Sequence, residues 1–452
     1  MTAANTEDSA RHSTLQRRIF WTGLVVRVLY MTLAHTYRFR TSEDHFQFGW
    51  EMARTGRALA TGRGFADPFD GHTGPTAWNP PLYPLLIGAV FRIFGIYTKL
   101  SAWVLLTLNS IASAATACAI YEIASRCFAS LPHPQPPLRR PTARSVALWS
   151  AWLWALYPAA MQYAVRWIWD MSLTAFLMAG LFVLALRVRG IGDPEPPART
   201  TGLWACFGLF WGAVALSNSS LVLLLPVMGV WMLGGRGWRV RLARNLSGAA
   251  LAGLLCVLTM TPWVVRNYRV FHQFIPFRDD FPVELDESLK YEHMGFPWGN
   301  PLTLNSLNVM RPEFRHYVAV GEKQYILERS QHVKQIFPER RAFFWKMTAR
   351  RFYFYWVSVP HPDDQGWLVE AAREMDYCFL SLAGIFGLVL ALRRRIPGMA
   401  LFAWAFVLLP LPYYFVTVQA RFRHPLEPLI TILAVYLFQS ATPRHNLRST
   451  QA

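Results

Sequence analysis

Residues Leu246 to Val265 have the sequence LSGAALAGLLCVLTMTPWVV, which contains no charged side chain. A helix of about 20 apolar residues is long enough to cross the hydrocarbon core of a bilayer. The stretch also lacks the polar face that a surface helix of a soluble domain would carry. It therefore predicts a membrane-spanning helix.

Similar apolar blocks recur along the chain, at 19–37, 82–97, 101–128, 145–164, 168–186, 203–216, 221–233, 377–392, 398–418 and 426–438. Hydrophobic residues make up 53% of the chain and charged residues only 16%, against about 25% charged in soluble domains. We therefore expect an all-α polytopic membrane protein with about 10 or 11 transmembrane helices.

The formal net charge of +18 comes largely from arginines in short stretches between the apolar blocks. Such placement is typical of loops that stay in the cytoplasm, so it predicts orientation of the chain and not nucleic-acid binding. The expected cytoplasmic parts are the tails and the basic loops, at 1–18, 131–144, 187–199, 236–244, 393–395 and 441–452.

This orientation divides the chain into regions. An N-terminal transmembrane region, 19–265, includes a long external loop at 38–80, and C-terminal helices occupy 377–440. Between them lies an extracytoplasmic segment, 266–376.

An odd number of membrane crossings is needed between Pro80, expected outside, and Arg139, expected inside. Block 82–97 is short and carries Arg92, so we expect it to lie along the interface or re-enter.

Several common sites are missing from the sequence. The five cysteines lie in or beside apolar blocks without a CxxC, which favours small apolar packing residues over disulfides or metal ligands. There is no phosphate-binding P-loop, no dinucleotide glycine fingerprint and no HExxH. The first block carries Arg27 and is followed by no cleavage site, so we expect a retained signal-anchor.

The richest polar cluster follows the first block: Arg40-Thr41-Ser42-Glu43-Asp44-His45. A carboxylate just outside a membrane helix can serve as general base for an acceptor hydroxyl. Glu43 and Asp44 equally suit the first turn of a short amphipathic helix from Ser42 to Thr55. Local physical chemistry leaves both roles open.

A family resemblance rests on this acidic pair and on four further motifs: Gly62-Arg63-Gly64-Phe65, Trp78-Asn79-Pro80-Pro81-Leu82-Tyr83-Pro84, Pro262-Trp263-Val264-Val265-Arg266-Asn267-Tyr268 and Arg421-Phe422-Arg423-His424-Pro425-Leu426-Glu427-Pro428. In order and hydropathy the chain resembles the GT-C glycosyltransferases. The closest likeness is to the family-39, protein-mannosyltransferase-like group, which includes the aminoarabinose transferases of lipid A. The resemblance implies a GT-C-like fold with juxtamembrane helices in the first external loop.

The same resemblance implies sugar transfer from a polyprenyl-phosphate donor to a protein, lipid or glycan acceptor. The enzyme would lie in a bacterial inner (plasma) membrane, with its site on the extracytoplasmic face. Asp44 takes the place of the family's catalytic Asp, although the order Glu43-Asp44 leaves open which carboxylate acts. Asp170 would face the same cavity, or would instead cap the helix that begins at Met171.

The donor phosphate needs a cation, because some relatives carry Lys where this chain has Asn79. The candidates are Arg63, Arg266, Arg421 and Arg423. A guanidinium fork can bind phosphate oxygens in pairs. Arg421 and Arg423 would also suit interfacial anchors, whose stems lie along apolar surface.

Two questions stay open at this level. A divalent metal is neither required nor excluded, and no other cofactor is indicated. A polytopic lipid or solute transporter or flippase is the alternative function. It would carry paired hydrophobic repeats and broken helices in both halves, and no clear internal repeat is present. A non-catalytic scaffold would not need Glu43 and Asp44 beside external arginines.

Overall fold

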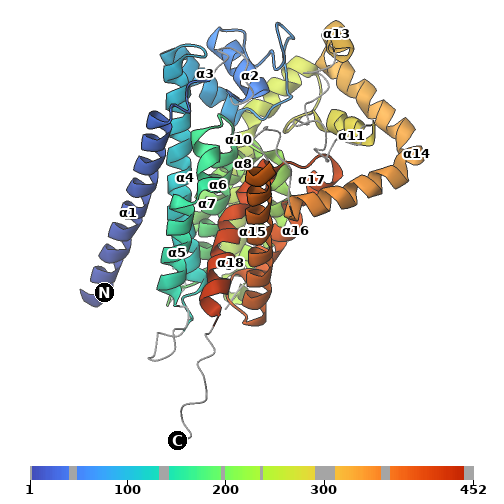
Figure 1. The fold of residues 1–452 in the computed structure, drawn as a ribbon. Helices are drawn as coiled ribbons and strands as arrows, with labels where there is room; N and C mark the ends of the chain where they lie inside the picture. Colours follow the sequence, from blue (N-terminus) through green and yellow to red (C-terminus); the bar gives the residue numbers. More distant parts are fainter. Residues whose placement is uncertain are drawn as a thin grey trace, which may run out of the picture.

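The computed structural model describes residues 3–39, 48–131, 142–194, 199–234, 238–290, 311–357 and 367–441. These ranges contain helices, turns and loops and no strand, which confirms the expected all-α fold for the described residues. Long helices run side by side in a bundle, with the start of α1 and the end of α18 at the same end (Figure 1). The opposite end, which carries α2, α11, α13 and α14, is called the outer end below.

The apolar blocks correspond to the helices of the bundle. Four segments are long and apolar enough to cross a membrane: Lys99–Cys127 (α4), Met171–Arg189 (α7), Leu242–Phe271 within α10 (Trp238–Phe271), and Trp367–Arg393 (α15). The remaining bundle helices are α1 (Ala3–Leu33), α5 (Ala143–Leu156), α6 (Pro158–Val165), α8 (Thr201–Ala215), η2 (Ser219–Leu224), α9 (Leu225–Leu233), α16 (Met399–Leu408), α17 (Leu411–Phe415), η3 (Ala420–Leu426) and α18 (Glu427–Ser440).

Helix α3 (Leu82–Phe94) stays at the outer end instead of crossing the bundle. Its first amide, Leu82 N, donates to Leu216 O at the end of α8 over 2.9 Å. Its last residue is followed after a short turn by α4, which starts at the same end. Thirteen residues span about 20 Å, less than the bilayer core of about 30 Å. With α3 outside the bilayer, α4 alone crosses between Pro80 and Arg139. This gives the odd number of crossings that the basic loops require.

The outer end is built from α2 (Trp50–Ala60), α3, α11 (Phe281–Lys290), α13 (Arg311–Val320) and α14 (Glu322–Trp356). Helix α14 continues through Pro338, which lies inside it. Glu322 ties this helix to the first external loop, because its carboxylate accepts from Thr76 Oγ1 and Ala77 N, both at 2.5 Å. Tyr317 of α13 donates to the same carboxylate at 2.7 Å.

The single block expected at 145–164 is broken into α5 and α6. Pro158 has no N–H, so the carbonyl of Trp154 loses its helical donor. Arg27 of α1, which is fully buried, supplies the replacement. Its guanidinium donates to Trp154 O at 3.1 Å and to Ala155 O at 2.6 Å. A charge inside the apolar bundle is thus explained by a backbone defect in the neighbouring helix.

Close helix contacts depend on glycine. In α8, a Cβ on Gly208 would lie 2.2 Å from Ala252 O of α10. In α15, a Cβ on Gly387 would lie 2.2 Å from Leu433 O of α18. Small residues at helix contacts allow backbones to approach closely, as is common in membrane bundles.

Replacing Arg27 by Met should destabilise the protein, because two buried carbonyls then lose their donor at a cost of about 1–3 kcal/mol each. Thermal unfolding in detergent measures the effect. Arg18→Met, on an exposed position of the same helix, is the matched control and should change the melting temperature little. Equal melting temperatures for the two variants would contradict the role assigned to Arg27.

Candidate active site

Charged side chains from four parts of the chain converge at the outer end. Glu51 comes from the first turn of α2, and Asp170 from the corner before α7. The segment after α10 contributes Arg278, Asp280 and Glu284, and η3 contributes Arg421. Arg421 attracts Asp170, Glu51 and Glu284, while Arg278 attracts Asp280, Glu284 and Asp170. These six residues are called the charged cluster below.

The corner that carries Asp170 is held by hydrogen bonds from neighbouring helices. Asn109 of α4 donates to Trp167 O at 3.1 Å and to Trp169 O at 3.4 Å. Tyr83 of α3 donates in turn to Asn109 Oδ1 at 3.1 Å. The corner is therefore fixed by side chains from both the crossing helix and the outer helix.

Asp170 is the residue that precedes α7, yet its side chain makes no capping hydrogen bond within the described part of the chain. Only 9% of the residue is exposed. The capping role that the sequence left open is thus not the one the side chain adopts. Its carboxylate lies instead within the field of Arg421, Arg278 and His424.

Arg421 is oriented by aromatic rings. Its guanidinium carbon lies 4.2 Å from the centre of the Trp169 ring and 5.3 Å from that of Phe422. Such cation–π contacts hold a guanidinium in place over an aromatic face. Because Trp169 adjoins Asp170 in the chain, the same corner positions both the acid and the cation.

The segment after α10 adds a second cation and two acids. Arg278 lies 2.8 Å from the carboxylate of Asp280. Burial raises the pKa of Asp280 to about 6, although the Arg278 charge opposes the shift. Burial, then the Asp280 charge, raise the pKa of Glu284 to about 7. Several acids are thus crowded around two guanidinium groups.

Two of the predicted phosphate-binding arginines brace the first external loop. Arg266 donates to Phe65 O at 2.5 Å and Thr76 O at 2.6 Å, and its guanidinium lies 5.3 Å from the Trp263 ring. Arg63 is paired with Asp67 at 3.3 Å. The contacts of these two arginines are therefore with the loop and with α10.

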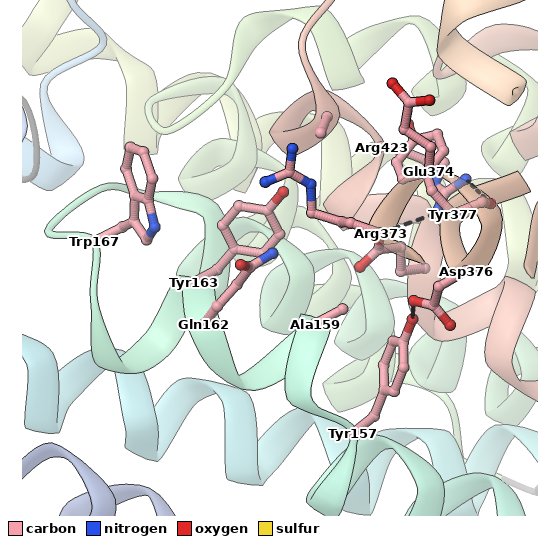
Figure 2. Close-up of a pocket in the computed structure, with 12 residues that line it drawn as sticks. Tyr157, Ala159, Gln162, Tyr163, Trp167, Arg373, Glu374, Asp376, Tyr377 and Arg423 are labelled. Atoms are coloured by element: carbon pink, nitrogen blue, oxygen red, sulfur yellow. Dashed lines mark hydrogen bonds and ion pairs between the residues drawn. The ribbon is translucent and has the colours of Figure 1, made fainter. Parts of the chain in front are cut away.

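Arg423 belongs to a different environment from Arg421. It is buried and donates to Ser381 Oγ at 2.5 Å and to Tyr377 O at 3.1 Å, both on α15. It also lies 3.4 Å from Glu427. The structure therefore brings Arg421, but not Arg423, into the charged cluster. Arg423 lines a pocket between α6 and α15 (Figure 2).

Glu43 and Asp44 lie outside the described residues. The residues that flank this stretch are described: the rings of Phe39 and Phe48 are 5.2 Å apart. Gly49 then packs on the Asp170 corner, with φ +87° and so little space that a Cβ would lie 2.3 Å from Ile168 O. The backbone five residues after Asp44 thus touches the corner that carries Asp170.

Sequence reasoning missed Glu51, Arg278, Asp280 and Glu284. The only local signal is the run Arg278-Asp279-Asp280 after an apolar turn. A metal site was left open from the sequence. Among the described residues, no group of three or more His, Cys, Asp or Glu side chains is placed to hold an ion, and metal dependence stays a prediction.

Comparison with solved structures identifies the fold. The apo oligosaccharyltransferase of Archaeoglobus fulgidus matches with a TM-score of 0.53 and 13% identity, covering 94% of this chain and 50% of that one. The same organism's AglB, in complex with an inhibitory peptide and a dolichol-phosphate, matches with a TM-score of 0.51 and 13% identity, covering 92% and 50%. The chain thus spans about half the length of these structures.

A further match, ArnT from Cupriavidus metallidurans bound to undecaprenyl phosphate, has a TM-score of 0.41 and 11% identity, covering 92% and 76%, too low a score to add to this result. No protein-family model and no curated protein matches the sequence. The oligosaccharyltransferase likeness confirms the predicted GT-C fold, and the chain is an all-α polytopic membrane protein.

Stability should fall as pH rises from about 4.5 to about 7, the window between the ordinary pKa of a glutamate and that of Glu284. In this window folded Glu284 keeps a proton that the unfolded chain has lost, so deprotonation favours unfolding. Glu284→Gln should therefore flatten the pH dependence of the melting temperature in detergent. Glu339→Gln, at an exposed position of α14, is the control. An unchanged slope for Glu284→Gln would refute the burial argument.

Proposed function

We propose that this protein is a glycosyltransferase that takes a sugar from a polyprenyl-phosphate carrier and transfers it to an acceptor outside the cytoplasm. The observation that carries the proposal is the charged cluster, in which the charges of Arg421 and Arg278 act on Asp170 at one end of an apolar bundle. Ionisable groups at such places usually mark a functional site, because their burial is costly.

The polarity of the bundle supports this location of the site. Helices α7 and α15 end in arginine-rich turns, at Arg187 and Arg189 and at Arg393 to Arg395, at the end opposite the charged cluster. Basic residues next to helix ends favour the cytoplasmic side. The outer end would then face away from the cytoplasm, with a bacterial inner membrane as the expected setting.

The donor class fits the cations of the site. The oligosaccharyltransferase with this fold was solved with a dolichol-phosphate, a lipid phosphate of the polyprenyl type. A phosphate leaving group gains negative charge as the bond to the sugar breaks. Fixed guanidinium groups stabilise that charge without reorganising. Arg421 and Arg278 would meet the phosphate oxygens, and the lipid chain would lie along the apolar helices.

The proposed reaction is a single displacement. The acceptor oxygen forms a bond to the anomeric carbon while the bond from that carbon to the phosphate oxygen breaks. The electron pair of the broken bond leaves with the lipid phosphate. Asp44, or Glu43 beside it, takes the proton of the acceptor hydroxyl. Gly49 supports this assignment, because five residues reach at most about 17 Å and Gly49 touches the Asp170 corner.

Asp44→Asn should lower transfer by about 10²–10⁴-fold, the usual contribution of a general base, while donor affinity is retained. The assay follows release of undecaprenyl phosphate from a radiolabelled undecaprenyl-phosphate sugar in proteoliposomes. Asp70→Asn, an exposed acid of the same loop, serves as control. Wild-type rates in Asp44→Asn but not in Glu43→Gln would move the role of base to Glu43. Lipid translocation without transfer would favour the flippase alternative.

Arg421→Ala should weaken binding of undecaprenyl phosphate by about 10- to 100-fold, because a charge-assisted contact to phosphate is lost. Binding can be measured by native mass spectrometry in detergent. Arg92→Ala, an exposed arginine of α3 at the same end, should bind like the wild type. Unchanged affinity in Arg421→Ala would assign that side chain to interfacial anchoring instead.

A further inference from the structure

A pocket lies between α6 and α15, next to the charged cluster but lined by other residues. Figure 2 shows its two walls: Tyr157, Gln162 and Tyr163 on one side, and Glu374 and Asp376 of α15 on the other. Arg423 of η3 and Glu427 of α18 also line it. The pocket is partly open to solvent, so that part of a sugar head group can enter it.

The pocket opens on the lipid-facing side of the bundle. Apolar side chains of both walls are exposed beside it: Leu156 at 47%, Met375 at 72% and Phe379 at 54%. Asp376 immediately precedes the apolar stretch 377–392 of α15, at the level where this helix is expected to enter the bilayer. Polar groups at this depth would meet the head of a lipid from the outer leaflet, since its chains can stay against the exposed apolar residues.

The lining does not suit a phosphate. Three carboxylates, of Glu374, Asp376 and Glu427, outnumber the guanidinium groups of Arg373 and Arg423. Both arginines already face acids, since Arg423 pairs with Glu427 and Arg373 with Glu370. An anionic head group would therefore be repelled.

The lining does suit hydroxyl groups. Glu427 already accepts from Arg423 and His424, and one oxygen of Asp376 from Tyr157. The carboxylate of Glu374 and the other oxygen of Asp376 can accept from sugar hydroxyls, and the amide of Gln162 can both donate and accept. The rings of Tyr157, Tyr163 and Trp167 offer flat apolar surfaces beside these groups. This combination of acceptors and aromatic faces matches an uncharged, hydroxyl-rich head group.

The pocket is a direct neighbour of the charged cluster. Tyr163 lines the pocket and also lies in the field of both Arg421 and Arg423. Ala420, another lining residue, precedes Arg421 in η3. Trp167 lines the pocket, and Trp169, two residues later, stacks on Arg421. A head group in the pocket would thus be separated from the site by Tyr163 and one turn of η3.

We propose that this pocket is the entry site of the acceptor, and that the acceptor is a membrane lipid with an uncharged, hydroxylated sugar head group. The inference rests on the proposed function, in which the donor phosphate is held separately by Arg421 and Arg278. Two lipids would then approach the site from different sides of η3, the anionic donor to the cationic side and the glycolipid to the acidic side.

The test uses the full chain in nanodiscs of phosphatidylcholine with a photoactivatable monoglucosyl diacylglycerol as the probe. The wild type should be labelled on α6 or α15, as mapped by mass spectrometry. Ala159→Trp, which fills the pocket from α6, should lower labelling by about tenfold. Leu392→Trp, at the other, lipid-exposed end of α15, should be labelled like the wild type. A photoactivatable phosphatidylglycerol should label the pocket about tenfold less than the glycolipid.

Equal labelling by the two probes, or full labelling of Ala159→Trp, would overturn the proposal. Binding of undecaprenyl phosphate to the same proteins separates the two inferences. Ala159→Trp should bind this lipid as tightly as the wild type does. If the wild type failed to bind it while glycolipid labelling stayed in the pocket, the proposed donor would be wrong and the glycolipid site would stand.

Discussion

Charged groups at the outer end of this apolar bundle persist because each is held against an opposite charge or an aromatic face. Arg421 over Trp169, beside Asp170, is the central example. An unpaired charge would be expelled or neutralised at such a place. The corner at 166–170, the turn η3 and the segment after α10 are therefore tied together by electrostatics. This constraint brings parts of the chain that are remote in sequence to one site.

The geometry of η3 explains why two neighbouring arginines have different environments. A 3-10 helix has three residues per turn, so residues two apart point about 120° away from each other. Arg421 accordingly faces Trp169 and Asp170, whereas Arg423 faces Tyr377 and Ser381 of α15. One short turn thus supplies a cation to the charged cluster and a wall to the neighbouring pocket.

The fold could be predicted from the sequence because membrane helices are selected by local hydropathy. Even the position of α3 followed from the charges of the loops. The break at Tyr157 and Pro158 was missed, since both halves are apolar and the compensating donor, Arg27, lies in another helix. A buried arginine in the first block was visible, but its partner carbonyls could only be found in the folded bundle.

The candidate site was predictable only in part. Asp170 and Arg421 stood out as polar residues at helix ends, and the structure places them together. Arg63 and Arg266 looked equivalent in sequence, yet their guanidinium groups bind the first loop, because that loop folds back on α10. Arg278 and Glu284 were missed because their importance comes from long-range packing. No periodic pattern in the sequence marks such residues.

The most direct test compares the affinity of the protein for undecaprenyl phosphate and for undecaprenol, which lacks the phosphate, in nanodiscs. If the guanidinium groups of Arg421 and Arg278 form a lipid-phosphate site, the phosphate-bearing lipid should bind about tenfold tighter or more. This difference should vanish when both arginines are replaced by alanine. Equal affinity of the wild type for the two lipids would contradict the account.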